Sequence, residues 1–264
     1  MTISLIIATY NWPEALFLSL KSVQNQIVLP TEILIADDGS DRRTQKIIED
    51  FRQSSKIPIH HIWQEDNGFR LAKIRNKAIF AAKSDYIIQI DGDIILNKNY
   101  VRDQIAVAKI GTFVTGSRVF MLKEKSTEIL KTKQISFSFF ERKIKNRLNG
   151  LHFPFINLFI KPKNKPYNKL IFKVRGCNMC FWRKDLIEIN GYDEQFAGWG
   201  REDSELALRL FKKGLSLKKL RFAGIQYHIF HNEQTKDNLE SNNKLLEMSQ
   251  NNNAFWCLDG ILKK

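Results

Sequence analysis

The sequence predicts an α/β domain in which helices flank a mostly parallel central sheet. Over the first 110 residues, short apolar runs alternate with stretches of helical periodicity, a pattern that is typical of βαβ units. Polar and acidic side chains follow several of these runs directly, where a parallel sheet binds its ligands. With 264 residues, 43% of them hydrophobic, the chain is long enough for one large domain or a domain with a subdomain.

Four strands and three crossover helices are expected in this first part. The strands are predicted at residues 3–8, 32–36, 57–63 and 86–90, and the helices at 13–23, 42–51 and 71–82. Pro13 stands near the first turn of its helix, where its missing N–H costs nothing. We therefore expect the site in the loops that follow Ala8, Ala36 and Ile90.

The composition changes between about residues 123 and 173, which are rich in Lys, Arg, aromatic residues and Pro. This change indicates an insertion on the core. Within it, residues 138–148 have the pattern of a basic amphipathic helix that would lie on a membrane surface or cover an acceptor site. The alternative is a subdomain that packs its aromatic side chains inward.

Regular elements resume after Cys177. They are a strand through Phe181, a short helix from Lys184, a helix at 202–213, and strands near Leu217 and Gln226. We expect residues 1–232 to form a single domain with a first half at 1–110 and a second at 174–232. Residues 233–264 are expected to be a tail that ends in a loosely attached helix.

The net charge of +14 favours anionic partners such as nucleotides, nucleic acids, acidic glycans or lipid headgroups, without choosing among them. One interpretation of this charge is a nucleic-acid-binding protein. The chain has no recognisable motif that binds RNA or DNA, so we do not expect nucleic acid as a partner. No run of about 18 apolar residues and no signal segment is visible, so we expect a cytoplasmic chain that does not span a bilayer.

The chain has three cysteines, too few for a disulfide framework, which favours a reducing compartment. Cys177 and Cys180 have the Cys-x-x-Cys spacing of zinc and redox motifs. Because no second pair completes a zinc site and no redox context surrounds them, we expect buried, unreactive thiols.

The segment Asp37-Asp38-Gly39-Ser40 follows a predicted strand and ends in a turn before a helix. A carboxylate at this place can accept a hydrogen bond from the imide of a uracil or from a ribose hydroxyl, while Gly39 allows the tight bend. The alternative is that one Asp caps the next helix.

Asp91 and Asp93 lie in an otherwise apolar segment and flank Gly92. Because burying an unpaired carboxylate is costly, they require a counter-charge. Mn²⁺ or Mg²⁺ bridging carboxylate and diphosphate oxygens would supply it, and would act as a Lewis acid on a departing nucleotide. Either His228 or His231 could complete the coordination of a metal held by Asp93, and His228 is preferred.

Farther along, Trp199 stands between two glycines, and Glu202 and Asp203 open a helix. Apolar residues follow at three, four and seven positions beyond Asp203, which places Asp203 on the stripe that faces inward. Near a helix N-terminus it would stay ionised, as a general base must. The alternative is that Asp203 only complements the dipole of the helix at its N-terminus. Trp199 offers a stacking surface for a sugar, or else belongs to the core.

Several motifs in this order resemble the family 2 glycosyltransferases, which have the Rossmann-like nucleotide-diphospho-sugar transferase fold called GT-A. The resemblance covers about residues 2–232. It rests on Ile6-Ile7-Ala8-Thr9-Tyr10-Asn11, Asp37-Asp38-Gly39-Ser40, Arg75-Asn76-Lys77-Ala78, Asp91-Gly92-Asp93, Arg175-Gly176-Cys177-Asn178 and Gly198-Trp199-Gly200-Arg201-Glu202-Asp203. The last two are similar to the region shared by β1,4-galactosyltransferases, polypeptide N-acetylgalactosaminyltransferases and bacterial chondroitin polymerases.

The resemblance implies roles for these residues. Ala8, Tyr10, Asp38 and Asp91 would line the nucleotide, with Arg75 and Gly92 also in the donor site; Asp93 would bind the metal; Trp199 and Glu202 would contact sugars; and Asp203 would be the catalytic base. One displacement would invert the anomeric carbon, so that an α-linked UDP-sugar gives a β-linked product. Arg201 departs from the related galactosyltransferases, which have Gly there, and this leaves the donor sugar open.

The leading hypothesis is a bacterial enzyme that builds a surface glycan such as lipopolysaccharide core, capsule or O-antigen. It would take a UDP-sugar donor, with a hexose or N-acetylhexosamine, and a glycan or lipid-linked glycan acceptor. The basic, aromatic insertion would hold that acceptor at the inner face of the cytoplasmic membrane, through peripheral contact with anionic lipid. The other readings are the nucleic-acid-binding protein and a scaffold that binds sugar nucleotide without turnover, against which the presence of both Asp93 and Asp203 argues.

Overall fold

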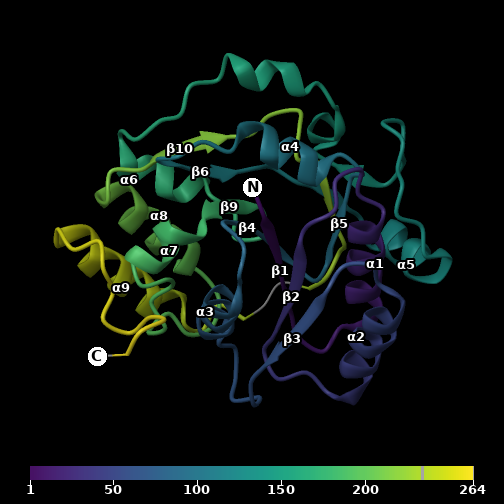
Figure 1. The fold of residues 1–264 in the computed structure, drawn as a ribbon, viewed down its shortest axis with the longest axis horizontal. Helices are drawn as coiled ribbons and strands as arrows, with labels where there is room; N and C mark the ends of the chain where they lie inside the picture. The colour runs from purple at the N-terminus through teal and green to yellow at the C-terminus, as the bar shows by residue number, and fades with distance from the viewer. Residues whose placement is uncertain (233–234, 264) are drawn as a thin grey trace.

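The computed structural model describes residues 1–232 and 235–263, and its centre is a seven-stranded sheet with the strand order β10-β6-β9-β4-β1-β2-β3 (Figure 1). The strands are β1 (Ile3–Thr9), β2 (Glu32–Asp37), β3 (Ile59–Trp63), β4 (Tyr86–Asp91), β6 (Thr112–Thr115), β9 (Met179–Trp182) and β10 (Ser216–Lys219). Only β9 runs antiparallel to its neighbours, β4 and β6. The predicted α/β fold with a mostly parallel sheet is therefore confirmed.

Helices cover both faces of this sheet because the central strands are apolar on both sides. In β1, Leu5 and Ile7 pack into one cluster with α1 (Pro13–Gln24), α2 (Arg42–Ser54) and α4 (Tyr100–Val107). Ile6 and Ala8 alternate with them and pack on the opposite face against α3 (Leu71–Ala81), α7 (Arg183–Glu188) and α8 (Glu202–Lys212). This two-sided burial is what a parallel sheet requires.

A smaller sheet of four strands stands beside the first, in the order β5-β11-β7-β8. Its strands are β5 (Ile94–Leu96), β7 (Val119–Met121), β8 (Ile144–Lys145) and β11 (Gln226–His228). It shares a third apolar cluster with α1 and with α5 (Lys123–Thr132). Because β5 follows β4 after a two-residue turn, this sheet lies against the carboxyl edge of the large one.

The remaining elements are short. They are the 3-10 helices Arg147–Gly150, Pro154–Leu158 and Ile171–Lys173, with α6 (Tyr167–Leu170) and α9 (Leu239–Asn251). The sequence did not predict β5, β6, β7, β8, α4 or α5. The expected boundary of the insertion at residues 123–173 stays a prediction, although α5 and β8 within it pack on the small sheet.

The amphipathic helix expected at residues 138–148 is wrong. In its place β8 pairs with β7, so that Ile144 lies opposite Met121 and packs against the third apolar cluster. Lys143 and Asn146 flank β8 with φ of 60° and 57°, left-handed values that end a helix. Strand pairing and burial of Ile144 therefore outweigh the helical periodicity of this segment.

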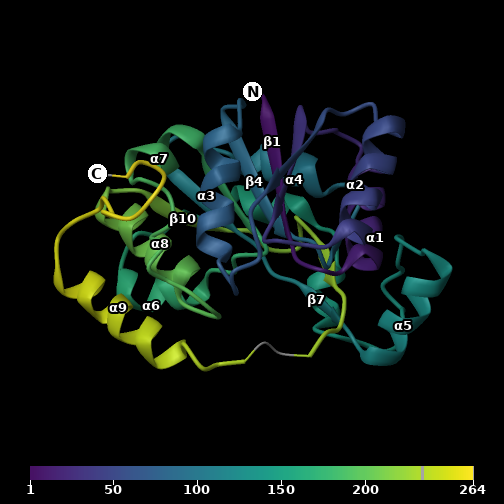
Figure 2. The same ribbon diagram turned by 90° about the horizontal axis from the view of Figure 1, so that it is seen from below.

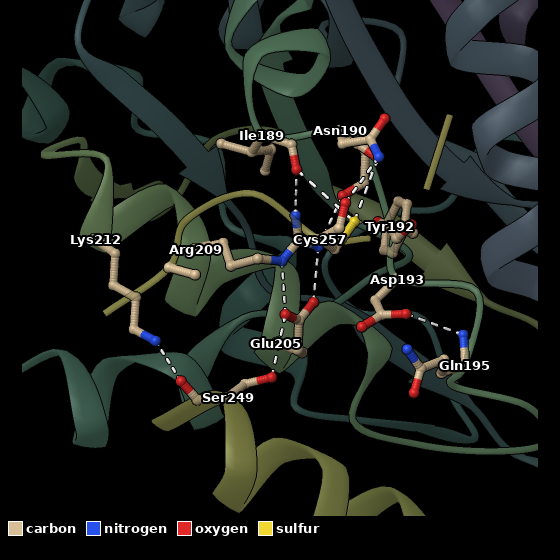
Figure 3. Close-up of polar contacts among 12 residues, drawn as sticks. Ile189, Asn190, Tyr192, Asp193, Gln195, Glu205, Arg209, Lys212, Ser249 and Cys257 are labelled. Carbon is tan, nitrogen blue, oxygen red and sulfur yellow. Dashed lines mark hydrogen bonds and ion pairs between the residues drawn. The ribbon is translucent and has the colours of Figure 1, made fainter. Parts of the chain in front are cut away.

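The tail was expected to be loosely attached, and this expectation is also wrong for the part that the structure describes; residues 233–234 and 264 lie outside it. Helix α9 packs along α8 and buries Leu246 (Figure 2). Beyond it, the buried Asn190 side chain donates to the carbonyls of Cys257 and Leu262. Figure 3 shows Cys257 and Ser249 next to the buried Glu205–Arg209 ion pair.

In the described part of the chain, no helix combines the length and the apolar character that crossing a membrane requires. The three cysteines are free and buried, and burial raises the pKa of the Cys177 thiol to about 12 and that of Cys180 well above its usual value. The expectation of buried thiols is confirmed, and the raised pKa values favour the protonated form.

Candidate active site

Three parallel strands end at the same edge of the large sheet and bring the sequence motifs together. β1 pairs with β2 and β4 in a register that places Thr9 beside Asp37, and Ala8 beside Asp91. The chain turns immediately after β4, where the Gly92 N–H donates to the Ala8 carbonyl at 2.7 Å. A Cβ atom on Gly92 would lie 3.0 Å from Thr9 Oγ1, so this close approach favours glycine.

The two acids after β2 have different surroundings. Asp37 is fully buried, accepts from Ser40 N at 2.9 Å and contacts His61 Nε2 at 2.8 Å, so it holds the turn together. Asp38 accepts from the Arg70 backbone N–H at 2.7 Å and from Gln64 at 2.5 Å, and burial raises its pKa. Neither is the cap of α2, because that place is taken by Asp41.

Tyr10 follows β1 and remains accessible, with 48% of its surface exposed. Its hydroxyl donates to Asp66 Oδ2 at 2.8 Å, which holds the ring beside the Asp38 loop. Gly39, with a φ of 97°, lets that loop pass within van der Waals contact of Asp66. An exposed ring fixed by one hydrogen bond is a suitable surface for a planar base to stack on.

Asp93 and two histidines form a cluster at the junction of the two sheets. Asp93 Oδ2 lies 3.1 Å from His231 Nε2 and 3.5 Å from His228 Nε2. The cluster is positioned by the small sheet, because His228 pairs with Ile94 and the Ile229 N–H donates to the Asp93 carbonyl at 3.0 Å. The structure thus brings both predicted histidines to Asp93.

The electrostatics of the cluster reflect its burial. Burial lowers the pKa of His228, whereas the hydrogen bond to Asp93 raises that of His231 to about 9. Burial alone would raise the pKa of the Asp93 carboxyl, but the two histidines hold it below its usual range.

These residues fit a divalent metal ion. One ligand atom from each of Asp93, His228 and His231 lies within 4.8 Å of the others. Asp93 Oδ1 is buried and has no hydrogen-bond partner among the residues that the structure describes. A buried carboxylate oxygen without a partner, next to two imidazoles, is a donor set that Mn²⁺ accepts.

Arg75 joins the two acidic motifs. Its buried guanidinium donates to Asp91 Oδ1 at 2.9 Å and lies 3.5 Å from Glu202 Oε1. Burial opposes the charge of Arg75, but Tyr192 and the surrounding acids raise its pKa. The close approach of Gly176 leaves room for this side chain, since a Cβ there would lie 3.2 Å from the guanidinium. The regions after β4 and before α8 therefore lie side by side.

Glu202 and Asp203 open α8 at this junction. Asp203 Oδ2 accepts from the Gly176 N–H at 3.0 Å and is partly buried, and the apolar residues that follow it, Leu206, Ala207 and Leu210, are fully buried. Burial, together with the charge of Asp203, raises the pKa of Glu202 to about 7. A carboxyl group whose pKa is raised by burial and by a neighbouring acid is a frequent feature of functional sites.

Trp199 lies before this helix with 42% of its surface exposed, so it does not belong to the core. The Lys236 ammonium lies 5.6 Å from the centre of the Trp199 ring. Arg201 has a φ of 80° at the N-cap of α8, a backbone conformation that favours the Gly of the related galactosyltransferases.

Arg118 was missed by the sequence analysis. It follows β6, an unpredicted strand, at the carboxyl edge of the large sheet. Its guanidinium stacks 4.5 Å from the centre of the Phe120 ring and donates to Cys177 Sγ at 3.3 Å, while its Nε is buried without a partner in residues 1–232 and 235–263. It faces the cluster closely enough to affect the pKa of Asp93 and His228. The sequence signal that could have found Arg118 is a single cation shortly after a strand, but β6 itself was not predicted.

Two known families match the sequence. Residues 4–176 match the family described as glycosyl transferase family 2. Residues 160–232 match the family described as the N-terminal domain of galactosyltransferase. The two matches overlap between Ile160 and Gly176 and together cover the motifs described above.

Curated and solved relatives agree with these matches. Chondroitin synthase of Escherichia coli is 27% identical over 243 residues, which cover 86% of this chain and 34% of that protein. A crystal structure of S. aureus TarS 1–349 in complex with UDP-GlcNAc is similar with a TM-score of 0.64 at 16% identity, covering 94% of this chain and 66% of that one. The mannosyltransferase PcManGT from Pyrobaculum calidifontis, in complex with GDP-Man and Mn²⁺, has a TM-score of 0.60 at 14% identity, covering 88% and 57%. The chain thus spans about a third of the length of the curated relative, and the structures show its fold.

Proposed function

The chain belongs to glycosyl transferase family 2 and has the GT-A fold, and from this premise we propose that it is an inverting, metal-dependent enzyme. Its donor is a UDP-sugar that carries a hexose or N-acetylhexosamine, and its acceptor is a hydroxyl of a glycan. The observation that carries the proposal is the Arg75 bridge between Asp91 and Glu202. Asp91 and Glu202 are close in sequence to the candidate metal ligand Asp93 and the candidate base Asp203, so the bridge supports a site that these residues share.

The donor would lie along the carboxyl edge of the sheet. The exposed Tyr10 ring would stack on the base, and Asp38, whose carboxyl group faces the same loop, would accept from the uracil or ribose. Ala8, Gly92 and Asp91 would line the nucleotide, with Arg75 holding the Asp91 carboxylate in place at 2.9 Å. That TarS binds UDP-GlcNAc on the same fold supports a UDP-sugar.

Asp93, His228 and His231 would hold Mn²⁺ or Mg²⁺. When bound, the ion supplies neutralisation of the negative charge that develops on a departing diphosphate. The PcManGT complex with Mn²⁺ supports this assignment. Arg118 would contribute a fixed positive charge beside the same region.

Asp203 would take the proton from the acceptor hydroxyl. The Gly176 N–H, which donates to its Oδ2 at 3.0 Å, orients the carboxylate, while Oδ1 accepts from Ser204 Oγ at 3.4 Å and keeps a further lone pair for the substrate. The acceptor oxygen then attacks the anomeric carbon as the bond to UDP breaks, and a single displacement converts an α-linked donor into a β-linked product. Glu202 and Trp199 would contact the sugars, since the Glu202 side chain keeps 13% of its surface exposed and Trp199 offers an accessible indole face.

We place this enzyme in the synthesis of a bacterial surface glycan, such as capsule, O-antigen or lipopolysaccharide core. It would work at the inner face of the cytoplasmic membrane, on a lipid-linked acceptor, by peripheral contact. The relation to a chondroitin synthase supports a glycan acceptor, and the net charge of +14 supports contact with anionic lipid.

The test is a screen of UDP-sugars for UDP release that depends on Mn²⁺, repeated with Asp203→Asn. We expect this substitution to lower kcat by roughly 10²-fold or more, because general-base catalysis contributes that much. The affinity for the donor, measured by calorimetry, should stay nearly unchanged. Weakened donor binding with unchanged turnover per bound donor would refute the role of Asp203.

Asp93→Asn provides the complementary variant. Because it removes a negatively charged metal ligand, we expect a weaker affinity for Mn²⁺ in a direct titration without donor or acceptor. Asp41→Asn, at the cap of α2 outside the site, is the control for loss of one carboxylate and should bind Mn²⁺ as the wild type does. Equal Mn²⁺ affinity in all three proteins would place the metal elsewhere.

A further inference from the structure

Residues 142–175, which we call the basic aromatic edge, have an unusual surface. No Asp or Glu occurs between Glu141 and Asp185, whereas residues 142–175 contain ten Lys and Arg. In Figure 1 part of this edge arches over α4 and β10 and descends to α6. Seven large hydrophobic side chains of the edge are exposed: Leu148, Phe153, Phe155, Leu158, Phe159, Tyr167 and Phe172. Such a combination marks a binding surface rather than a solvated one.

The 3-10 helix Pro154–Leu158 buries a polar side chain and exposes apolar ones. Its one buried residue is the polar Asn157, whose side chain donates to the Arg221 carbonyl at 2.8 Å and accepts from the Arg221 N–H at 2.9 Å. Phe155 and Leu158 point outward and are 67% and 78% exposed, and Phe159 just beyond is 82% exposed. The backbone is therefore fixed by buried polar contacts, while the apolar side chains are presented to the outside.

Cations flank the exposed side chains of Phe155, Leu158 and Phe159, which we call the apolar tip. Four exposed lysines follow the tip in the chain: Lys161, Lys163, Lys165 and Lys169. Of these, Lys163 pairs with Leu217 of β10. Nearby, the buried Lys218 ammonium donates to the Asn157 carbonyl at 2.6 Å, which ties the tip to the sheet. A rigid apolar tip beside a row of lysines is the arrangement of an interfacial membrane anchor.

From this geometry we infer that the basic aromatic edge is a docking surface for an anionic phospholipid bilayer, with the side chains of Phe155, Leu158 and Phe159 inserted among the headgroups. The inference rests on the proposed membrane setting of the enzyme, but not on its chemistry. Single-stranded nucleic acid, the other partner of basic aromatic surfaces, fits less well. It needs separate rings on which bases can stack, whereas Phe153 and Phe155 pack edge to face on each other at 6.3 Å.

The edge is continuous with the site. Near its beginning, Asn149 donates to the Arg118 carbonyl at 2.9 Å, and directly after its end the Gly176 N–H donates to Asp203. The tip itself is joined to residues just beyond the carboxyl end of β10, because the Phe153 N–H donates to the Phe222 carbonyl at 2.7 Å. Since β10 is parallel to β6, the tip and the site lie at the same edge of the sheet. Docking would therefore present the site to acceptors held in the membrane.

The experiment is sedimentation of the full chain with vesicles of phosphatidylcholine, with and without phosphatidylglycerol. We expect binding that requires phosphatidylglycerol and weakens with salt. The double substitution Leu158→Ser, Phe159→Ser should weaken it by about tenfold or more, because it removes two inserted side chains. Its matched control, Phe80→Ser with Met248→Ser, changes side chains that are 63% and 67% exposed elsewhere and should bind as the wild type does.

A second pair tests the cations. Lys161→Glu with Lys165→Glu should also weaken binding by about tenfold or more, whereas Lys46→Glu with Lys56→Glu, exposed on another side, should have a clearly smaller effect. Vesicle binding that survives both edge variants would overturn the inference. So would binding to single-stranded RNA that is tighter than to the vesicles and is lost in the Leu158, Phe159 variant.

Transferase activity separates this inference from the proposed function. Each edge variant should still release UDP with a soluble acceptor, since none of the four substituted residues belongs to the site. Loss of vesicle binding with activity retained supports the docking surface. A wild type that binds these vesicles but turns over no sugar nucleotide would contradict the proposed function and leave the docking surface supported.

Discussion

The Glu202 side chain lies among three charged groups, Arg75, Asp91 and Asp203, and its pKa is raised to about 7 by burial and by Asp203. Between pH 4.5 and about 7, the folded state holds a proton on Glu202 that the unfolded state has released. The stabilising contribution of Glu202 is therefore complete below pH 4.5. The contribution is lost as the pH rises through 7. We expect the stability of the wild type, relative to Glu202→Gln, to fall by about 2 kcal/mol between pH 5.5 and 8.

Urea unfolding at a series of pH values measures this difference. Glu240→Gln is the control, because Glu240 is 83% exposed at its side chain and should show no such dependence. A constant difference between wild type and Glu202→Gln over the whole range would mean that Glu202 is ionised throughout.

At the scale of single residues, the sequence predicted the acids but not their partners. Two carboxylates in the apolar segment around Gly92 required a counter-charge, and this reasoning pointed to a metal. The structure shows that Asp91 has the counter-charge of Arg75, while Asp93 faces the histidines. The sequence preferred His228 over His231, whereas the structure brings both to Asp93, because the turn that folds His231 back depends on the pairing of β11 with β5.

At the scale of elements, the start of α8 carries backbone strain. Arg201 adopts a φ of 80°, yet its side chain donates to Asn243 of α9 and lies over the Phe172 ring at 5.2 Å. Both substitutions Arg201→Gly and Arg201→Ala remove these contacts, but only glycine relieves the strain. We therefore expect the alanine variant to be less stable than the glycine variant by about 1 kcal/mol.

Thermal and urea unfolding of the two variants check this order. Lys212, at the other end of α8, provides the control pair: its φ is helical, so Lys212→Gly should be less stable than Lys212→Ala by about 1 kcal/mol. The opposite order at the two ends is the expected result. The same order at both would show that the conformation of Arg201 costs nothing.

Elements of the first half were predicted well because each is specified locally, by an apolar run for a strand and by periodic apolar residues for a helix. The wrong predictions concern segments whose structure depends on contacts with residues far away in the sequence. Ile144 is drawn into a strand by β7, and α9 is held on α8 by burial of its own Leu246 and by the contact of its Asn243 with Arg201. Neither β7 nor Arg201 is near these segments in the sequence. A local pattern shows that such a segment is amphipathic, but not what it packs on.

At the scale of the whole molecule, the two halves meet at buried charges. Asp91 belongs to the first half and Glu202 to the second, and Arg75 is the one cation that the described residues place between them as an ion-pair partner of both. The family resemblance implied that the two acidic motifs serve one reaction, with Asp93 at the metal and Asp203 as the base. What it could not supply is the bridge, because Arg75 lies on α3, before both motifs in the chain, and contacts them only in the folded protein.

The bridge makes a prediction for global stability. Arg75→Met keeps most of the side-chain volume but leaves two carboxylates facing each other without their cation. We expect a loss of about 3 kcal/mol, at the lower end for a buried pair because the Asp91 side chain is 33% exposed and partly screened. Arg43→Met is the matched control: its pair with Glu14 is at the surface, with side chains 67% and 50% exposed, and its loss should cost less than about 1 kcal/mol.

A double-mutant cycle separates the bridge from simple packing. If Arg75 stabilises the protein by compensating Glu202, then Glu202→Gln should cost less, or even stabilise, once Arg75 is Met, because a neutral amide no longer requires the cation. We expect a coupling energy above about 1 kcal/mol from urea unfolding at pH 8, where Glu202, with its pKa near 7, is ionised in the wild type. Strictly additive effects would mean that the halves are joined by their apolar contacts, and that Arg75 serves the donor site without holding the fold together.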